Sequence, residues 1–192
     1  GQAGIAVIGD NIAAGTGDRA RLDIPYSGRG YFDQFLSGQC PCFNASLGGD
    51  GAAYKVGNNA FNFAGRWRIV EMCERALIHI GTNDLASGSP LATIKANLIE
   101  LATQAKLRGI RKVVLATVLP RTTSTDGWQT LANQTLVATS DFSNQRTLLN
   151  DWILTVPAPF DAVIDLRLGV EDLATVDGIS RELAEEIYRA LR

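Results

Sequence analysis

A series of short apolar runs, spread along the whole chain, constrains what this sequence can fold into. Each run is mainly apolar and shows no regular alternation of apolar and polar residues. This pattern is typical of parallel strands that are covered on both faces of a sheet. The five runs are Ile5–Ile8, Cys42–Ala45, Ala76–Ile80, Lys112–Val118 and Ala162–Leu166. We therefore predict five buried strands.

Segments with helical spacing separate these runs. The clearest covers Ser89–Arg108, where Ser89 suits an N-cap and Pro90 suits the first helical position. Further helices are predicted over Ser140–Leu154 and Arg181–Leu191. Strands that alternate with helices indicate βαβ units and a parallel sheet. Because 192 residues with 46% hydrophobic content suit one α/β core, we expect a single domain over residues 1–192.

Composition argues against several classes of partner. The net charge is −2, and the Lys and Arg residues are scattered, so we expect neither nucleic acid nor a membrane surface as a partner. No apolar stretch reaches the roughly 20 residues of a membrane helix. The three cysteines, Cys40, Cys42 and Cys73, are odd in number and are not spaced as a zinc site. We expect no cofactor and no metal.

Four segments follow the predicted strands and hold the candidate site. In open α/β sheets, ligands bind outside the carboxyl ends of the strands. The first strand leads into Gly9-Asp10-Asn11, and the second into "NASLGGDG" at 44–51. The third leads into "GTND" at 81–84, and "VDGIS" at 176–180 lies some distance beyond the fifth.

These four segments, in this order, resemble the sequence blocks of the SGNH (GDSL-like) hydrolases. That family includes esterases, thioesterases, lipases and carbohydrate acetylesterases. The resemblance covers nearly the whole chain and extends to "LPRTTSTDGW" at 119–128, which is similar to members from bacteria and their phages. It implies a three-layer α/β/α fold with a flavodoxin-like, five-stranded parallel sheet.

The resemblance also implies roles for particular residues. In the family a serine in the first block is the nucleophile, and an Asp-x-x-His block supplies the base and the acid that orients it. A glycine N–H and an asparagine amide help to form the oxyanion hole. Gly49 (with Gly48 a close second) and Asn83 match these two donors, and Asp177 matches the triad acid.

Two positions depart from the family pattern. Asn11 stands where the nucleophilic serine belongs, and Ser180 stands where the histidine base belongs. A carboxamide is a poor nucleophile because its nitrogen lone pair is delocalised, and a serine triad needs a base. Ser180 is well placed to cap the last helix. His79, the only histidine, lies within the third predicted strand and is expected in the core.

Three functions are compatible with these residues. The first is an SGNH-like domain without esterase catalysis that binds a small ester, acyl or glycan ligand, or that serves in a larger assembly. The second is an active ester hydrolase altered at Asn11. The third is a divergent enzyme that uses the carboxylates of Asp10, Asp84 and Asp177, with or without a metal. Arg121 either lines the pocket or anchors its loop, and the loop over 121–128 either binds sugars or only connects elements.

Overall fold

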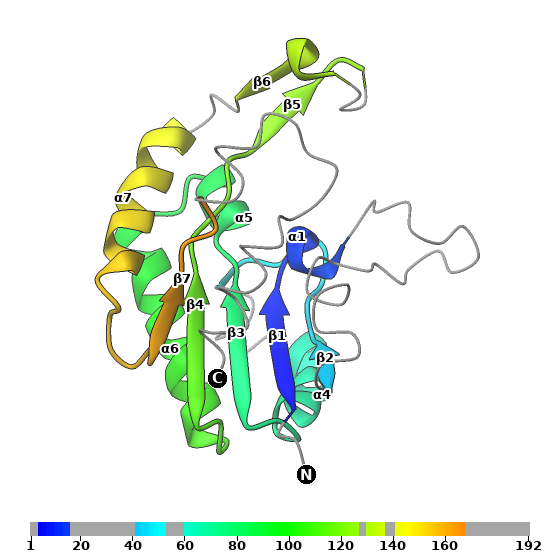
Figure 1. The fold of residues 1–192 in the computed structure, drawn as a ribbon, viewed down its shortest axis with the longest axis vertical. Coiled ribbons are helices and arrows are strands. Elements are labelled where there is room, and N and C mark those ends of the chain that lie inside the picture. Colours follow the sequence, from blue (N-terminus) through cyan, green and yellow to red (C-terminus); the bar gives the residue numbers. More distant parts are fainter. Residues whose placement is uncertain (1–3, 16–40, 53–59, 127–129, 137–140, 168–192) are drawn as a thin grey trace, which may run out of the picture.

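A computed structural model describes residues 4–15, 41–52, 60–126, 130–136 and 141–167. Its main sheet has five parallel strands in the order β2-β1-β3-β4-β7 (Figure 1). The strands are β1 (Ile5–Gly9), β2 (Cys42–Asn44), β3 (Arg75–His79), β4 (Lys112–Ala116) and β7 (Ala162–Ile164). The predicted five-stranded parallel sheet of an α/β fold is confirmed, and each apolar run contributes one strand.

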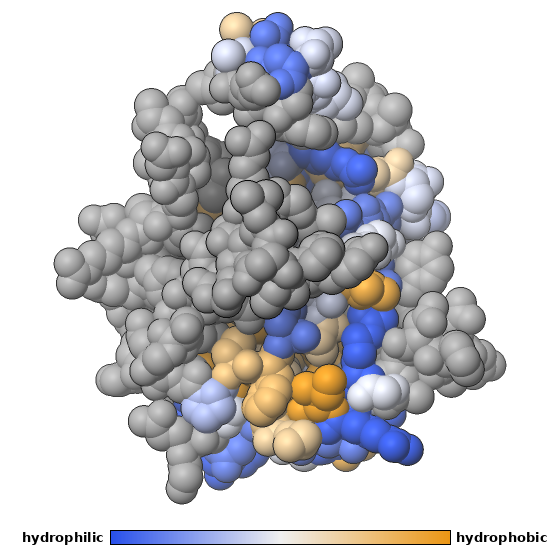
Figure 2. Space-filling view, turned by 90° about the vertical axis from the view of Figure 1, so that its right-hand side faces the viewer, coloured by the Kyte–Doolittle hydropathy of each residue, from blue (hydrophilic) through white to orange (hydrophobic). Residues whose placement is uncertain are grey.

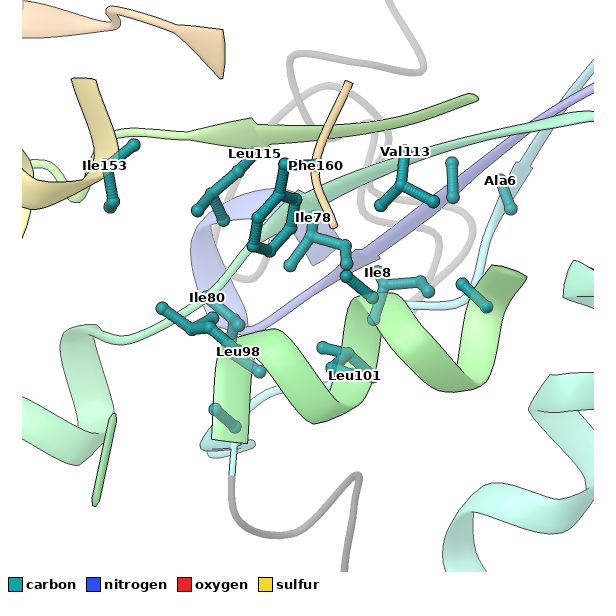
Figure 3. Close-up of a cluster of buried hydrophobic side chains, with 14 of the residues drawn as sticks. Ala6, Ile8, Ile78, Ile80, Leu98, Leu101, Val113, Leu115, Ile153 and Phe160 are labelled. Atoms are coloured by element: carbon teal, nitrogen blue, oxygen red, sulfur yellow. The ribbon is translucent and has the colours of Figure 1, made fainter. Parts of the chain in front are cut away.

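Helices that pack on one face of the sheet build the larger part of the core. They are α4 (Ala60–Val70), α6 (Leu91–Leu107) and α7 (Phe142–Leu154). Side chains from α6, such as Leu98 and Leu101, meet Ile8, Ile78 and Leu115 of the strands (Figure 3). The opposite face carries a second buried cluster, which includes Ala13 of the short helix α1 (Asn11–Ala14). Both faces are therefore covered, as continuous apolar strands require.

The start of α6 differs from the prediction. The helix begins at Leu91 with Pro90 at the N-cap position, so Ser89 does not cap it. The Ser89 N–H donates to the Asp84 carbonyl at 3.0 Å instead. Pro90 has φ −58° and ψ 136°, which is an extended and not a helical conformation, so the helix begins one residue later than predicted. The predicted helix over 181–191 lies outside the described residues.

A small antiparallel hairpin follows β4 and projects beyond the main sheet (Figure 1). It is formed by β5 (Thr122–Ser124) and β6 (Gln134–Leu136), with the 3-10 turn η1 (Leu131–Asn133) before β6. Asp126 ties the hairpin together because its carboxylate accepts hydrogen bonds from Ser124 and Thr130 at 2.7 Å each. Part of the predicted loop over 121–128 is therefore a strand.

Apolar side chains gather on the lower part of the face that Figure 2 presents, on the β2 and α4 side of the molecule. Exposed large apolar residues of this region include Phe43 on β2, Ile69 on α4 and Met72 just after α4. No helix among the described residues is long and apolar enough to cross a bilayer.

Candidate functional site

The site lies where the strand order reverses direction, between β1 and β3. From β1 the chain goes to β2 on one side, and from β3 it goes to β4 on the other. Ligands of open α/β sheets bind at such a switch point. Asn11 begins α1 directly after β1, and Asn83 lies in α5 (Thr82–Ala86) directly after β3.

The two donors implied by the family resemblance converge on one oxygen atom, Asn11 Oδ1. The Gly49 backbone N–H donates to this atom at 2.6 Å, and Asn83 Nδ2 donates to it at 3.3 Å. A side-chain carbonyl of the protein itself therefore accepts hydrogen bonds from the groups that the resemblance assigns to a substrate oxyanion. Within the part of the chain that the structure describes, no hydrogen bond of this kind involves Gly48.

The chemistry of their neighbours fixes the orientation of both amides. Asn83 Nδ2 also donates to the Asp50 carbonyl at 2.9 Å, and Asn83 Oδ1 accepts from Arg121 Nη1 at 3.3 Å. Backbone N–H and guanidinium groups only donate, and a carbonyl only accepts. A flip of Asn83 or of Asn11 would place donor against donor or acceptor against acceptor. Arg121 therefore reaches Asn83, and this hydrogen bond is compatible with both sequence-based alternatives, a residue that lines the site and one that anchors its loop.

The loop that carries Gly49 is held from several sides. Gly49 has φ +82°, a left-handed conformation that favours glycine. Next to it, the Asp50 carboxylate forms an ion pair with Arg66 of α4 at 2.7 Å, and Arg66 also donates to the Ala45 carbonyl at 3.2 Å. Sequence reasoning missed Arg66, because no motif links a residue within a helix to a loop far behind it in the chain.

The corner between β1 and α1 leaves no room for a larger residue at Gly9. A Cβ atom there would lie 2.3 Å from Ala13 Cβ and 2.7 Å from the His79 carbonyl oxygen. The next residue, Asp10, caps α1 by accepting from the Ile12 N–H at 3.0 Å. These contacts determine where the chain turns, and hence where Asn11 enters the site.

The carboxylates of the acidic residues at this edge of the sheet accept hydrogen bonds from backbone N–H groups. Asp10 holds the Ile12 N–H, and Asp84 Oδ2 accepts from the Ala52 N–H at 2.9 Å. Both residues are buried. Within the described ranges there is no group of three His, Cys, Asp or Glu side chains that could hold a metal ion. The carboxylates that can be seen here thus brace the loops of the site.

His79 is the last residue of β3 and is only 3% exposed. Burial lowers its pKa to about 4, because the low-dielectric surroundings disfavour the charged imidazolium. By the two-residue alternation of a strand, its side chain shares the sheet face of Leu77, which belongs to the second core cluster. His79 is therefore neutral near pH 7 and lies in the core.

The sequence of the chain matches the model of the GDSL-like lipase/acylhydrolase family over residues 7–178. The chain belongs to this family. The five-stranded parallel sheet agrees with that membership. The first three family blocks follow β1, β2 and β3 in that order. The fourth family block, "VDGIS" at 176–180 with Asp177 and Ser180, lies outside the described residues.

Solved structures with the same fold cover almost the whole of this GDSL-like chain. A protein described as lipolytic and of the G-D-S-L family, from Desulfitobacterium hafniense DCB-2, matches with a TM-score of 0.66 and 16% identity over 98% of this chain and 99% of its own. A psychrotrophic esterase from Pseudoalteromonas matches with a TM-score of 0.58 and 17% identity, over 97% and 95%. An acetyl-xylooligosaccharide esterase from Geobacillus matches with a TM-score of 0.50 and 16% identity, over 98% and 91%. At these identities the likeness shows the fold.

Proposed function

We propose that this GDSL-like domain does not hydrolyse esters and that the sheet edge around Asn11 and Asn83 binds a ligand, an acyl group or a glycan, without cleaving it. The observation that carries the proposal is the position of Asn11 Oδ1, which accepts hydrogen bonds from the Gly49 N–H and the Asn83 amide. An ester carbonyl that entered the site would have to compete with this internal oxygen for both donors.

The residue at the nucleophile position supports the same proposal. Acyl transfer by a covalent route needs a hydroxyl or thiol that a base can deprotonate. Asn11 offers neither group, and its carbonyl oxygen faces the donors of the site. Its nitrogen has no hydrogen-bond acceptor among the described residues, and the side chain is exposed.

The chain also has no histidine that is suited to act as the base. His79 is its single histidine, and this residue is buried within the core with a pKa lowered to about 4. An imidazole with so low a pKa is a weak base, and a buried one does not reach a substrate at the sheet edge. Ser180, at the family's histidine position, has no basic group.

A binding role is favoured over a purely structural one by the exposure of the site. Asn11, Gly49 and Arg121 are all exposed, so that polar groups which converge from three segments remain accessible to a ligand. Glycan is one ligand class to test, because a solved structure with this fold is an acetyl-xylooligosaccharide esterase.

Ester hydrolysis by the purified domain tests the proposal. We expect p-nitrophenyl acetate and p-nitrophenyl butyrate to be hydrolysed no faster by the chain than by the Asn11→Ala variant. We also expect no labelling by a fluorophosphonate, which reacts with activated serines. Steady turnover of either ester, together with one labelled serine, would overturn the proposal and favour an active hydrolase with a displaced nucleophile.

A further inference from the structure

The oxygen of Asn11 marks a preformed acceptor position at the edge of the sheet. Two donors from different segments point at it, the Gly49 N–H and Asn83 Nδ2. The Asp50 carbonyl and Arg121 hold the Asn83 amide in the orientation that makes Nδ2 a donor to this point. Any oxygen that took the place of Asn11 Oδ1 would find the same two hydrogen bonds.

We propose that this position is an exchangeable carboxylate site, in which the carboxylate of an external ligand replaces Asn11 Oδ1 on Gly49 and Asn83, with Arg121 as the charge partner. The inference rests on the proposed function, because it assumes that this edge of the sheet binds a ligand without cleaving it. It narrows the acyl ligand class to molecules that present a free carboxylate.

Because a ligand oxygen must compete with Asn11 Oδ1, a negatively charged acceptor is favoured over a neutral one. An internal amide oxygen is held next to its donors at a high effective concentration, and a neutral ester carbonyl gains nothing by replacing it. A carboxylate forms charge-assisted hydrogen bonds, which are shorter and roughly twice as strong as neutral ones. Only a charged acceptor is therefore expected to displace the amide.

Arg121 provides the positive charge next to this position. Its Nη1 lies 3.3 Å from Asn83 Oδ1, and its side chain is exposed. A guanidinium has five donors in a planar fork that matches a carboxylate, so that one hydrogen bond to Asn83 leaves other donors for a ligand.

The aspartate carboxylates near the site form contacts with other groups of the chain. Asp50 is paired with Arg66, Asp84 accepts from the Ala52 N–H, and Asp10 accepts from the Ile12 N–H. All three of these aspartates are buried, whereas Arg121 is exposed. Because their charges still oppose an incoming anion, we expect weak binding of a minimal carboxylate, with a dissociation constant in the millimolar range.

The local geometry allows the exchange. The exposed Asn11 side chain can rotate into solvent, where its amide is hydrated. A Cβ atom placed on Gly49 would meet no heavy atom within 4 Å, so there is open space beside the donor. Displacement of the amide thus requires a side-chain rotation but no movement of the buried loops.

Titration of the isotope-labelled chain with sodium butyrate tests the proposal. The readout is the NMR chemical shift of the Gly49 backbone amide and of the Asn83 side-chain amide. Butyramide serves as the neutral isostere, and sodium chloride controls for ionic strength. We expect saturable shifts with butyrate and none with the two controls. Equal shifts with chloride, or no saturable shift with up to about 200 mM butyrate, would overturn the carboxylate site.

Three variants sharpen the test. Arg121→Gln should weaken butyrate binding about 5- to 10-fold, whereas Arg111→Gln should leave it unchanged, because Arg111 pairs with Glu74 at the opposite edge of the sheet. Asn11→Ala should bind butyrate more tightly, since the internal competitor is gone. Saturable binding in Asn11→Ala alone would also overturn the proposal, because the native amide would then not be displaced.

This outcome is separable from that of the proposed function. Ester turnover by the unaltered chain would contradict the noncatalytic role, whatever butyrate does. Absence of both turnover and butyrate binding would contradict the carboxylate site alone.

Discussion

At the scale of single residues, Asn11 and Asn83 show that the orientation of an amide side chain depends on its hydrogen-bond partners. The substitution of an amide at the serine position could be seen in the sequence, and so could the asparagine in "GTND". The hydrogen bond between the Asn11 oxygen and the Asn83 nitrogen could not be predicted from the sequence. The χ angles of both residues are set by their contacts with Gly49, Asp50 and Arg121. These partners are distant in sequence and meet only at the folded sheet edge.

His79 gives a prediction about acid stability. Its pKa is lowered by burial to about 4 in the folded chain, against about 6.5 in the unfolded chain. Between these values the unfolded chain binds a proton that the folded chain does not, so stability decreases as the pH is lowered. Between pH 7.5 and pH 5 this residue should reduce the free energy of unfolding by about 2 kcal/mol.

Urea unfolding of the chain and of His79→Gln at both pH values measures this contribution. The His79→Gln variant should lose about 2 kcal/mol less than the unaltered chain over the same pH interval. An identical loss in both proteins would show that the imidazole is protonated without cost in the fold.

At the scale of elements, the corner between β1 and α1 is the tightest joint near the site. Gly9→Ala would place Cβ 2.3 Å from Ala13 Cβ and 2.7 Å from the His79 carbonyl oxygen. Overpacking of this kind typically costs 1–3 kcal/mol, and backbone cannot yield as a flexible side chain does. We expect Gly9→Ala to lower the unfolding free energy by at least about 2 kcal/mol.

Gly65 of α4 offers a matched control for that substitution. A Cβ there would meet no heavy atom within 4 Å, and the residue lies within a helix. Gly65→Ala should raise stability by about 0.5–1 kcal/mol, because glycine disfavours helices. Chemical denaturation of both variants checks the pair, and equal effects would contradict the close contact at Gly9.

The connection from β4 toward Arg121 depends on one buried amide of α7. Asn150 Oδ1 accepts from the Val118 N–H at 2.8 Å, and Asn150 Nδ2 donates to the Val118 carbonyl at 2.9 Å. Asn150→Ala would leave the buried Val118 N–H without this acceptor, whereas the Val118 carbonyl would keep a donor in Arg146 Nη1 at 3.4 Å. An unsatisfied buried group costs roughly 1–3 kcal/mol, so we expect a loss of about 2 kcal/mol. The exposed Asn144→Ala, on the same helix, should change unfolding by less than about 0.5 kcal/mol. Similar losses in thermal or urea unfolding would contradict this role for Asn150.

At the scale of the whole molecule, the sheet could be predicted because its signal is local. Each strand lies in a mainly apolar run, and each of the first three leads directly into a polar or glycine-rich corner. The helix boundary at Pro90 and the hairpin over 122–136 were harder, since they depend on proline geometry and on the Asp126 hydrogen bonds. The ion pair of Arg66 with Asp50 has no local signal at all.

We propose that the chain keeps the fold of this hydrolase family without a working nucleophile and base, and Asn11 Oδ1 accepts hydrogen bonds from the Gly49 N–H and Asn83 Nδ2. Conversion of Asn11 to serine restores the nucleophile and removes the internal acceptor, but it adds no base. This single substitution therefore separates a chain that has lost its catalysis from an active hydrolase altered at one position.

Hydrolysis of p-nitrophenyl butyrate by Asn11→Ser, compared with Asn11→Ala at equal concentration and pH, is the most direct test. Serine without a base is a weak nucleophile, so we expect the rates of the two variants to agree within about 10-fold. A rate for Asn11→Ser that exceeds that of Asn11→Ala by 1,000-fold or more, on the order of 4 kcal/mol of transition-state stabilisation, would contradict the proposal.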